Sequence, residues 1–180
     1  MRSKAKTVNG KELNGNCSSS PPGRWRMTDR ITVLAALPWM AARSSLEAIF
    51  ERCRWQLHLC RSCADIRSQL DCSPGVTLTA DHLPDGDWKD VLFDARRLRV
   101  APPLIVASHV PDARLWSEVL HLGGYDVLTI PFLAREVILS ISLAWRRWHD
   151  QWTLASQDPM RTSSAGSAAL RAGHSFSRDI

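Results

Sequence analysis

Short apolar runs alternate with longer segments of helical period through the middle of this 180-residue chain. The apolar runs have the length of buried strands, and they occupy residues 31–36, 55–60, 75–80, 103–108 and 125–129. Five strands that alternate with five helices predict a parallel sheet, because each helix must carry the chain back across the sheet before the next strand begins.

The five segments of helical period cover residues 38–53, 63–70, 87–98, 111–122 and 132–148. Pro38 suits the first turn of a helix, and the pair Gly123 and Gly124 suits a helix end. Right-handed crossovers leave few topologies for such a chain. We expect an α/β fold, a doubly wound five-stranded parallel sheet of flavodoxin-like order 2-1-3-4-5 flanked by five helices, with a ligand site at the carboxyl ends of its strands.

The two ends of the chain differ in composition from the middle. Residues 1–28 form a basic segment, with six Lys or Arg against one Glu, and we expect it to be a disordered tail. We expect one folded domain at residues 29–150 and a second disordered tail at 151–180, with no output domain after it. Because Met27 lies just before the first strand, the natural protein could lack residues 1–26.

Net charge and hydropathy exclude several classes of function. The formal net charge of +5 is matched by that of residues 1–28 alone, so the basicity belongs to the tails and we do not expect nucleic acid as a partner. No run reaches the roughly 20 apolar residues of a membrane helix, and no signal peptide follows the basic start. We therefore expect a cytoplasmic protein that does not enter a membrane.

The stretch "TADHLPDGDW" at residues 79–88 raises the question of what the end of the third strand does. It predicts a strand end, a Leu-Pro turn and a helix start, with Ala80 four residues before Pro84. The order of elements, with "LPDGD" after the third strand, Ser108 at the end of the fourth and "PF" after the fifth, resembles the CheY-like receiver domain of two-component response regulators. The resemblance covers residues 29–150.

The resemblance implies a phosphorylation pocket that has lost its reactive groups. The position of the phosphoacceptor aspartate is Ala80, and the positions of the acidic pair that holds Mg²⁺ are Ala35 and Ala36. Ser108 is retained, and Ile130 replaces the lysine of the fifth loop. The fifth-strand position that carries a switching aromatic in the family is Val127.

These replacements remove the chemistry of phosphoryl transfer. Mg²⁺ binds hard oxygen ligands, which alanine methyl groups do not supply, and nothing would neutralise charge on the transferred group. We therefore predict a degenerate receiver, or pseudo-receiver, of phosphorelay signalling that is not an enzyme and needs no cofactor. It would act by protein–protein interaction with a kinase, another regulator or its own copy as a homodimer. The emptied crevice could still hold a small ligand.

Two alternatives keep a chemical activity. Asp81 could replace the lost acceptor, although neighbouring strand residues point to opposite faces and Asp81 should not point where Ala80 points. Cys60 and Cys63, in "CRSC" at the start of a predicted helix, could form a redox pair, because a helix N-terminus lowers the pKa of a thiol. A zinc site that adds Cys53, His58 and Cys72 lacks a second closely spaced pair. Five cysteines without a secretion signal favour reduced thiols.

The last predicted helix carries one apolar stripe, made of Leu133, Val137, Ile141, Trp145, Trp148 and Trp152. Its tryptophan end lies beside Arg146 and would pass the edge of the sheet, and tryptophan and arginine are frequent at interface hot spots. The predicted contact surface consists of Trp116, Val127, Trp145, Arg146 and Trp148. The alternative is that the indoles only cover the bottom of the domain.

Overall fold

A computed structural model describes residues 30–71 and 74–157. Its main sheet has five parallel strands: β1 (Thr32–Ala36), β2 (Gln56–Cys60), β3 (Val76–Ala80), β6 (Leu104–Ser108) and β7 (Asp126–Thr129). The spatial order is β2-β1-β3-β6-β7, which is the predicted order 2-1-3-4-5. The predicted flavodoxin-like sheet is therefore confirmed.

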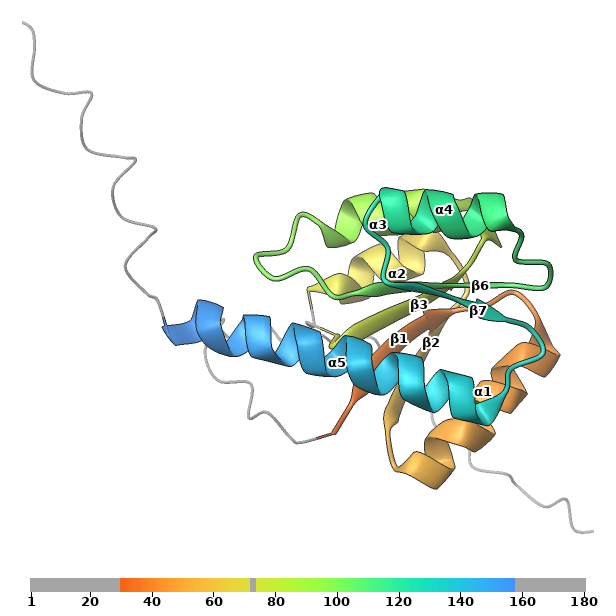
Figure 1. The fold of residues 1–180 in the computed structure, drawn as a ribbon, viewed down its shortest axis with the longest axis horizontal. Coiled ribbons are helices and arrows are strands. Elements are labelled where there is room, and N and C mark those ends of the chain that lie inside the picture. Colours follow the sequence, from red (N-terminus) through yellow and green to blue (C-terminus); the bar gives the residue numbers. More distant parts are fainter. Residues whose placement is uncertain (1–29, 72–73, 158–180) are drawn as a thin grey trace, which may run out of the picture.

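Five helices cover the two faces of the sheet. They are α1 (Met40–Cys53), α2 (Cys63–Leu70), α3 (Trp88–Ala95), α4 (Ala113–His121) and α5 (Ala134–Gln157). Helices α1 and α5 lie on one face, and α2, α3 and α4 lie on the other (Figure 1). Because both faces are covered, the central strands are mostly apolar, and every residue of β3 and β6 is buried, including Thr77, Thr79 and Ser108.

Side-chain caps define where three helices begin. The hydroxyl of Ser62 accepts from Asp65 N at α2, and the carboxylate of Asp112 accepts from Leu115 N at α4. Asp87 and Asp90 form a capping box at α3. Helix α4 ends at His121, and Gly123, two residues later, has a φ of 86° in the left-handed region that favours glycine.

Helix α5 is longer than the sequence pattern predicted. We expected it to end at residue 148 and a tail to begin at 151, but α5 continues to Gln157, so the tail boundary was wrong by seven residues. The ring of Trp148 stacks on that of Trp152 at 5.4 Å, and Nη2 of Arg99 donates to Ala155 O at 2.6 Å. These contacts give the last turns packing partners. Residues 1–29 and 158–180, where tails were expected, lie outside the described residues.

A small antiparallel hairpin follows β3, where only a turn was expected. Its strands are β4 (His82–Leu83) and β5 (Gly86–Asp87), paired in a separate two-stranded sheet. Strands of two residues have no hydrophobic period, so the pattern of the sequence could not reveal them. None of the helices in residues 30–71 and 74–157 is both long and apolar enough to cross a membrane.

Candidate functional site

The carboxyl ends of strands β1 and β3 carry buried alanine methyl groups on both faces of the sheet, and we refer to these groups together as the methyl patch. The side chains of Ala35, Ala36 and Ala80 are completely buried there. In the register of the sheet, Ala36 lies beside Thr79 and Ala80 lies beside Ala107. Three of the positions that the receiver resemblance assigns to acids are therefore occupied by enclosed methyl groups at one end of the sheet.

Asp81 and Ser108 lie together at the rim of this patch. The Oγ of Ser108 donates to Oδ2 of Asp81 at 2.9 Å, and Asp81 Oδ1 accepts from the backbone N–H of His82 at 2.9 Å. The backbone N–H of Asp81 donates to Ala107 O at 3.1 Å, which continues the ladder between β3 and β6 by one step. Asp81 is half-buried whereas Ala80 is enclosed, so the two side chains occupy different environments.

The sequence pattern did not reveal the contact between Asp81 and Ser108. Strands β3 and β6 pair Ala80 with Ala107, so the next residue of each strand, Asp81 and Ser108, is also side by side. Paired residues of adjacent strands point to the same face, and this explains why the hydroxyl reaches the carboxylate. The signal that could have found this pair was the register, which a single sequence does not contain.

The residues around Asp81 and Ser108 do not fit a magnesium ion. Within the described part of the chain, no group of three His, Cys, Asp or Glu side chains is placed to hold a metal. Ile130, at the position of the family lysine, is 5% exposed and its N–H donates to Ser108 O at 2.8 Å. A single carboxylate with two hydrogen bonds is a poor replacement for the oxygen shell that Mg²⁺ requires.

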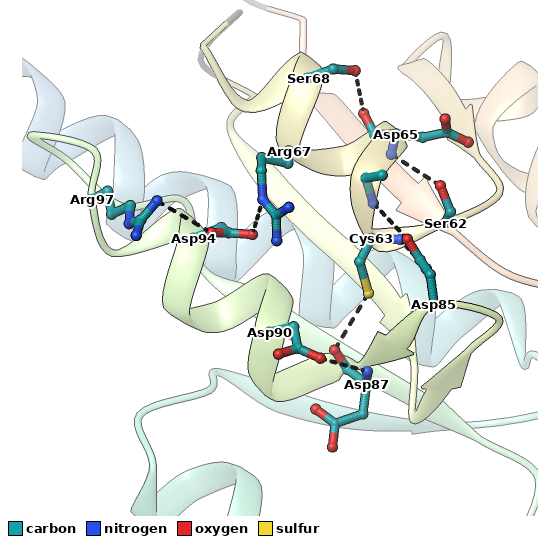
Figure 2. A network of polar contacts seen from close by, with 11 residues as sticks. Ser62, Cys63, Asp65, Arg67, Ser68, Asp85, Asp87, Asp90, Asp94 and Arg97 are labelled. Carbon is teal, nitrogen blue, oxygen red and sulfur yellow. Dashed lines mark hydrogen bonds and ion pairs between the residues drawn. The ribbon is translucent and has the colours of Figure 1, made fainter.

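The other acids at this end of the sheet, Asp85, Asp87 and Asp90, hold the hairpin against α2 and α3 (Figure 2). Oδ1 and Oδ2 of Asp85 accept from the backbone N–H groups of Cys63 and Ala64, at 2.7 and 2.9 Å. These hydrogen bonds lower the pKa of Asp85 below its usual value. Asp90 Oδ2 accepts from the N–H of Asp87 at 3.0 Å. The carboxylates of this segment are therefore engaged with backbone amides at helix starts.

Helices α2 and α3 are also joined by an ion-pair group (Figure 2). Nε of Arg67 lies 2.6 Å from Oδ2 of Asp94, and Nη1 of Arg97 lies 3.8 Å from Oδ1. Asp94 is 7% exposed, while both arginines are at the surface. The buried carboxylate has its charge balanced, and the pair of helices is fixed beside the hairpin.

The thiols of Cys60 and Cys63 are unsuited to redox exchange. Burial raises the pKa of each to about 12, and the carboxylates of Asp65 and Asp85 act in the same direction. The expected lowering by the start of α2 is outweighed because Asp85 and burial disfavour a thiolate there. The two cysteines are free thiols, and Cys72 of the zinc alternative lies outside the described residues.

A groove lies between α4 and α5 over the edge strand β7. Its volume is about 500 Å³, and the exposed apolar side chains on its walls are Trp116, Leu139 and Leu143. Val127 contributes to the lining but is only 4% exposed. Of the predicted contact residues, Trp116 is thus accessible and Val127 lies beneath the surface. We refer to this region as the α4–α5 groove.

The tryptophan end of α5 packs on its own domain. Trp148 is 7% exposed, and Trp145 is half-buried with its ring over Gly75, where a Cβ would lie 2.6 Å from the Trp145 Cδ1. Arg146 is exposed. The indoles of Trp145 and Trp148 therefore cover the bottom of the sheet, which was the alternative to an open contact surface.

Comparison with protein-family models finds no match, and comparison with curated proteins finds none either. Solved structures do match. A signal receiver domain of an HD domain-containing protein from Pseudomonas fluorescens Pf-5 is 20% identical, with a TM-score of 0.64 over 72% of this chain and 97% of the other. A response regulator receiver domain protein (CheY-like) from Methanospirillum hungatei JF-1 is 16% identical, with a TM-score of 0.59 over 66% and 96%.

A receiver domain of a Francisella response regulator is 21% identical and has a TM-score of 0.58, covering 64% of this chain and 96% of its own. Each match spans nearly the whole of the other chain and leaves out about a third of this one. At these identities the likeness concerns the arrangement of the backbone. The chain has the fold of the response-regulator receiver domain.

Proposed function

We propose that this chain is a degenerate receiver of two-component signalling that acts in the cytoplasm by binding a protein, without being phosphorylated. The observation that carries the proposal is the enclosed methyl patch of Ala35, Ala36 and Ala80 at the end of the sheet where a receiver would hold its metal and its acceptor. Such a patch has no nucleophile and no metal ligand.

The loss of the lysine position strengthens the argument. A transferred phosphoryl group carries negative charge, which a receiver must neutralise with cations. Ile130 is apolar and enclosed. A phosphate placed beside Asp81 would add charge to a carboxylate with no metal between them, and this repulsion opposes the reaction.

The α4–α5 groove supports binding as the remaining activity. Trp116 is 38% exposed, and Leu139 and Leu143 are 59% and 48% exposed on the facing helix. Apolar side chains that cluster around a hollow on a soluble domain are typical of contact sites. A kinase, another regulator or a second copy of the chain would dock there, with Trp116 as the central anchor.

Incubation with acetyl phosphate and Mg²⁺ tests the first half of the proposal. We expect intact-protein mass spectrometry to detect no phosphoryl adduct, with an active receiver domain as the positive control. An adduct on the wild type would contradict the proposal.

Replacement of Trp116 by Ser tests the second half. We expect it to remove binding of partners captured from native extract, or self-association in sedimentation velocity. Phe93→Ser is the matched control, because Phe93 is also an exposed aromatic residue, at 63%, but lies on α3. Equal effects of the two substitutions would exclude the α4–α5 groove as the docking site.

One observation favours a second function, phosphorylation of Asp81. Ser108 donates to its Oδ2, which resembles the contact of a hydroxyl with an acceptor site, and Asp81 is half-buried rather than enclosed. Attack of a carboxylate oxygen on acetyl phosphate would form an aspartyl phosphate and release acetate. A mass gain that Asp81→Asn abolishes would establish this function in place of the first.

A further inference from the structure

A hollow lies at the opposite end of the sheet from Asp81 and Ser108. It is bordered by the end of α3, by residues 101–103 before β6, by the segment between α4 and β7, and by the outer half of α5. Because β6 and β7 begin here, this is the amino end of the sheet. The outer half of α5 extends beyond the strands in Figure 1 and supplies one wall.

The hollow has the size of a small-molecule site. Its volume is about 330 Å³, within the range of roughly 300–1,000 Å³ that is typical of such sites. Leu92, Ala95, Pro102 and Trp148 give it apolar walls. These four residues are buried in the fold, so the walls are held in place by the core itself.

The charges at the hollow have one sign. Arg96 and Arg147 line it, and no Asp or Glu is among its lining residues. Within the described part of the chain, Arg147 forms no ion pair. A guanidinium presents a planar set of donors that matches a carboxylate or a phosphate, and its attraction is not cancelled here by a neighbouring acid.

The position of Arg96 is determined by the backbone next to it. Its Nη2 donates to the carbonyl of Leu122, just before Gly123. A Cβ on Gly123 would lie 2.6 Å from that Nη2, so the guanidinium occupies the space that a side chain would fill. Because Gly123 has no side chain, the guanidinium of Arg96 can lie against the backbone at the mouth of the hollow.

An unsatisfied polar group in the wall gives independent support. Trp148 is 7% exposed, and its Nε1–H has no hydrogen-bond partner among the described residues. Buried donors are nearly always paired in folded proteins, and one that is not requires an explanation such as a missing ligand. Trp148 lines the hollow, so an occupant of the hollow lies next to the residue that carries this unpaired donor.

We propose that this hollow binds a small organic anion. Its carboxylate or phosphate group would lie between Arg96 and Arg147, and its apolar body would lie against Trp148 and Pro102. The site lies away from Asp81 and Ser108 and shares only Tyr125 with the α4–α5 groove. Its arginines and apolar walls take no part in the function proposed above.

Titration with matched probes tests the proposal. We would add benzoate, phenyl phosphate or the neutral benzamide to the ¹⁵N-labelled full chain, up to about 10 mM, which detects dissociation constants near 1 mM. The readout is the indole N–H signal of Trp148, assigned with Trp148→Phe. We expect benzoate, phenyl phosphate or both to shift this signal, and benzamide to bind at least about tenfold more weakly. The two anions distinguish an organic acid from a phosphate ester.

The adjacent arginines of α5 provide a variant and its control. Arg147→Gln should weaken binding of the anion about tenfold or more, whereas Arg146→Gln, an exposed neighbour that does not line the hollow, should leave it unchanged. Both residues are at the surface, so both variants should melt like the wild type. The proposal is overturned if neither anion shifts the Trp148 signal, if benzamide binds equally well, or if both variants behave alike.

Discussion

The two ends of the parallel sheet differ in where charge is placed. At the carboxyl end, Ala35, Ala36 and Ala80 are enclosed methyl groups, and the nearby Asp85 is occupied with backbone amides. At the amino end, a hollow is lined by two arginines and by no acid. The comparison teaches that the two ends of one sheet can differ in chemistry: buried methyl groups and paired carboxylates lie at the carboxyl end, and two arginines lie at the amino end.

The fold tolerates different chemistry at its two ends because most of its stabilising contacts are in the middle of the sheet. The central strands β1, β3 and β6 are almost entirely buried, and their apolar contacts do not depend on either set of loops. Ligand sites, in contrast, are built from loops and helix ends. The two ends can therefore change independently, and each can be tested by substitution.

Restoring the acceptor carboxylate should have the largest effect. Ala80→Asp would place a charge in a site that is 0% exposed and has no metal, and we expect it to lower the free energy of unfolding by about 3 kcal/mol or more at pH 7. Burial would raise the pKa of the new carboxyl, so the loss should diminish as pH falls below that pKa and the group becomes neutral. Urea denaturation at several pH values measures this loss of stability.

Ala80→Asn separates charge from size in that experiment, because the amide is as large as the carboxylate but stays neutral. If Asn is as destabilising as Asp at pH 7, and the loss of stability does not change with pH, the cause is the size of the new side chain and not its charge. Added Mg²⁺ should not restore stability to Ala80→Asp, because the neighbouring positions are Ala35 and Ala36.

At the amino end, Gly123→Ala should destabilise the domain. The left-handed φ of 86° and the contact with Arg96 Nη2 together predict a loss of about 1–2 kcal/mol in thermal or urea unfolding. The variant should also bind benzoate more weakly, since Arg96 must move. Gly123→Asn is the control for the backbone, because asparagine tolerates this φ. An unchanged melting curve for Gly123→Ala would show that Arg96 is not held there.

The contact between Ser108 and Asp81 should contribute less. Removal of the hydroxyl by Ser108→Ala loses one hydrogen bond of 2.9 Å to a half-buried carboxylate, so we expect about 1 kcal/mol. A double-mutant cycle with Asp81→Asn measures how much of this free energy comes from the interaction between the two side chains. A coupling energy near zero would mean that the two side chains are neighbours without stabilising each other.

Asp85→Asn should have the smallest effect, and it should depend on pH. The pKa of Asp85 is lowered by the N–H groups of Ala64 and Cys63, so its contribution is fully present above the unfolded-state value of 3.8 and is lost as pH falls through the folded-state pKa. Acid unfolding followed by circular dichroism should therefore begin at a higher pH in wild type than its neutral-pH stability alone implies. In Asp85→Asn this part of the acid dependence should be absent.

Much of the fold follows from local pattern, whereas the site depends on pairing that the pattern does not contain. Each of the five strands was expected within one residue of its observed start, because an apolar run between turn residues is a local signal. The side-by-side arrangement of Asp81 and Ser108 depends on the register of β3 and β6, which is a property of two segments 27 residues apart.

The features that were missed have similar causes. The raised pKa of Cys63 depends on burial and on Asp85, which approaches from the hairpin. Trp148 was expected at an open surface, but the additional turns of α5 bring Trp152 onto its ring. Sequence spacing indicates which residues share a helix face, but not whether another residue covers that face.

Tyr125 belongs to both the hollow at the amino end and the α4–α5 groove. Its side chain therefore borders both sites. If its phenol ring stays fixed, an occupant of one compartment has no influence on the other. If the ring turns when either fills, each occupant changes the affinity of the other by the same factor, and a metabolite-sized anion would regulate a protein contact on the far side of one side chain.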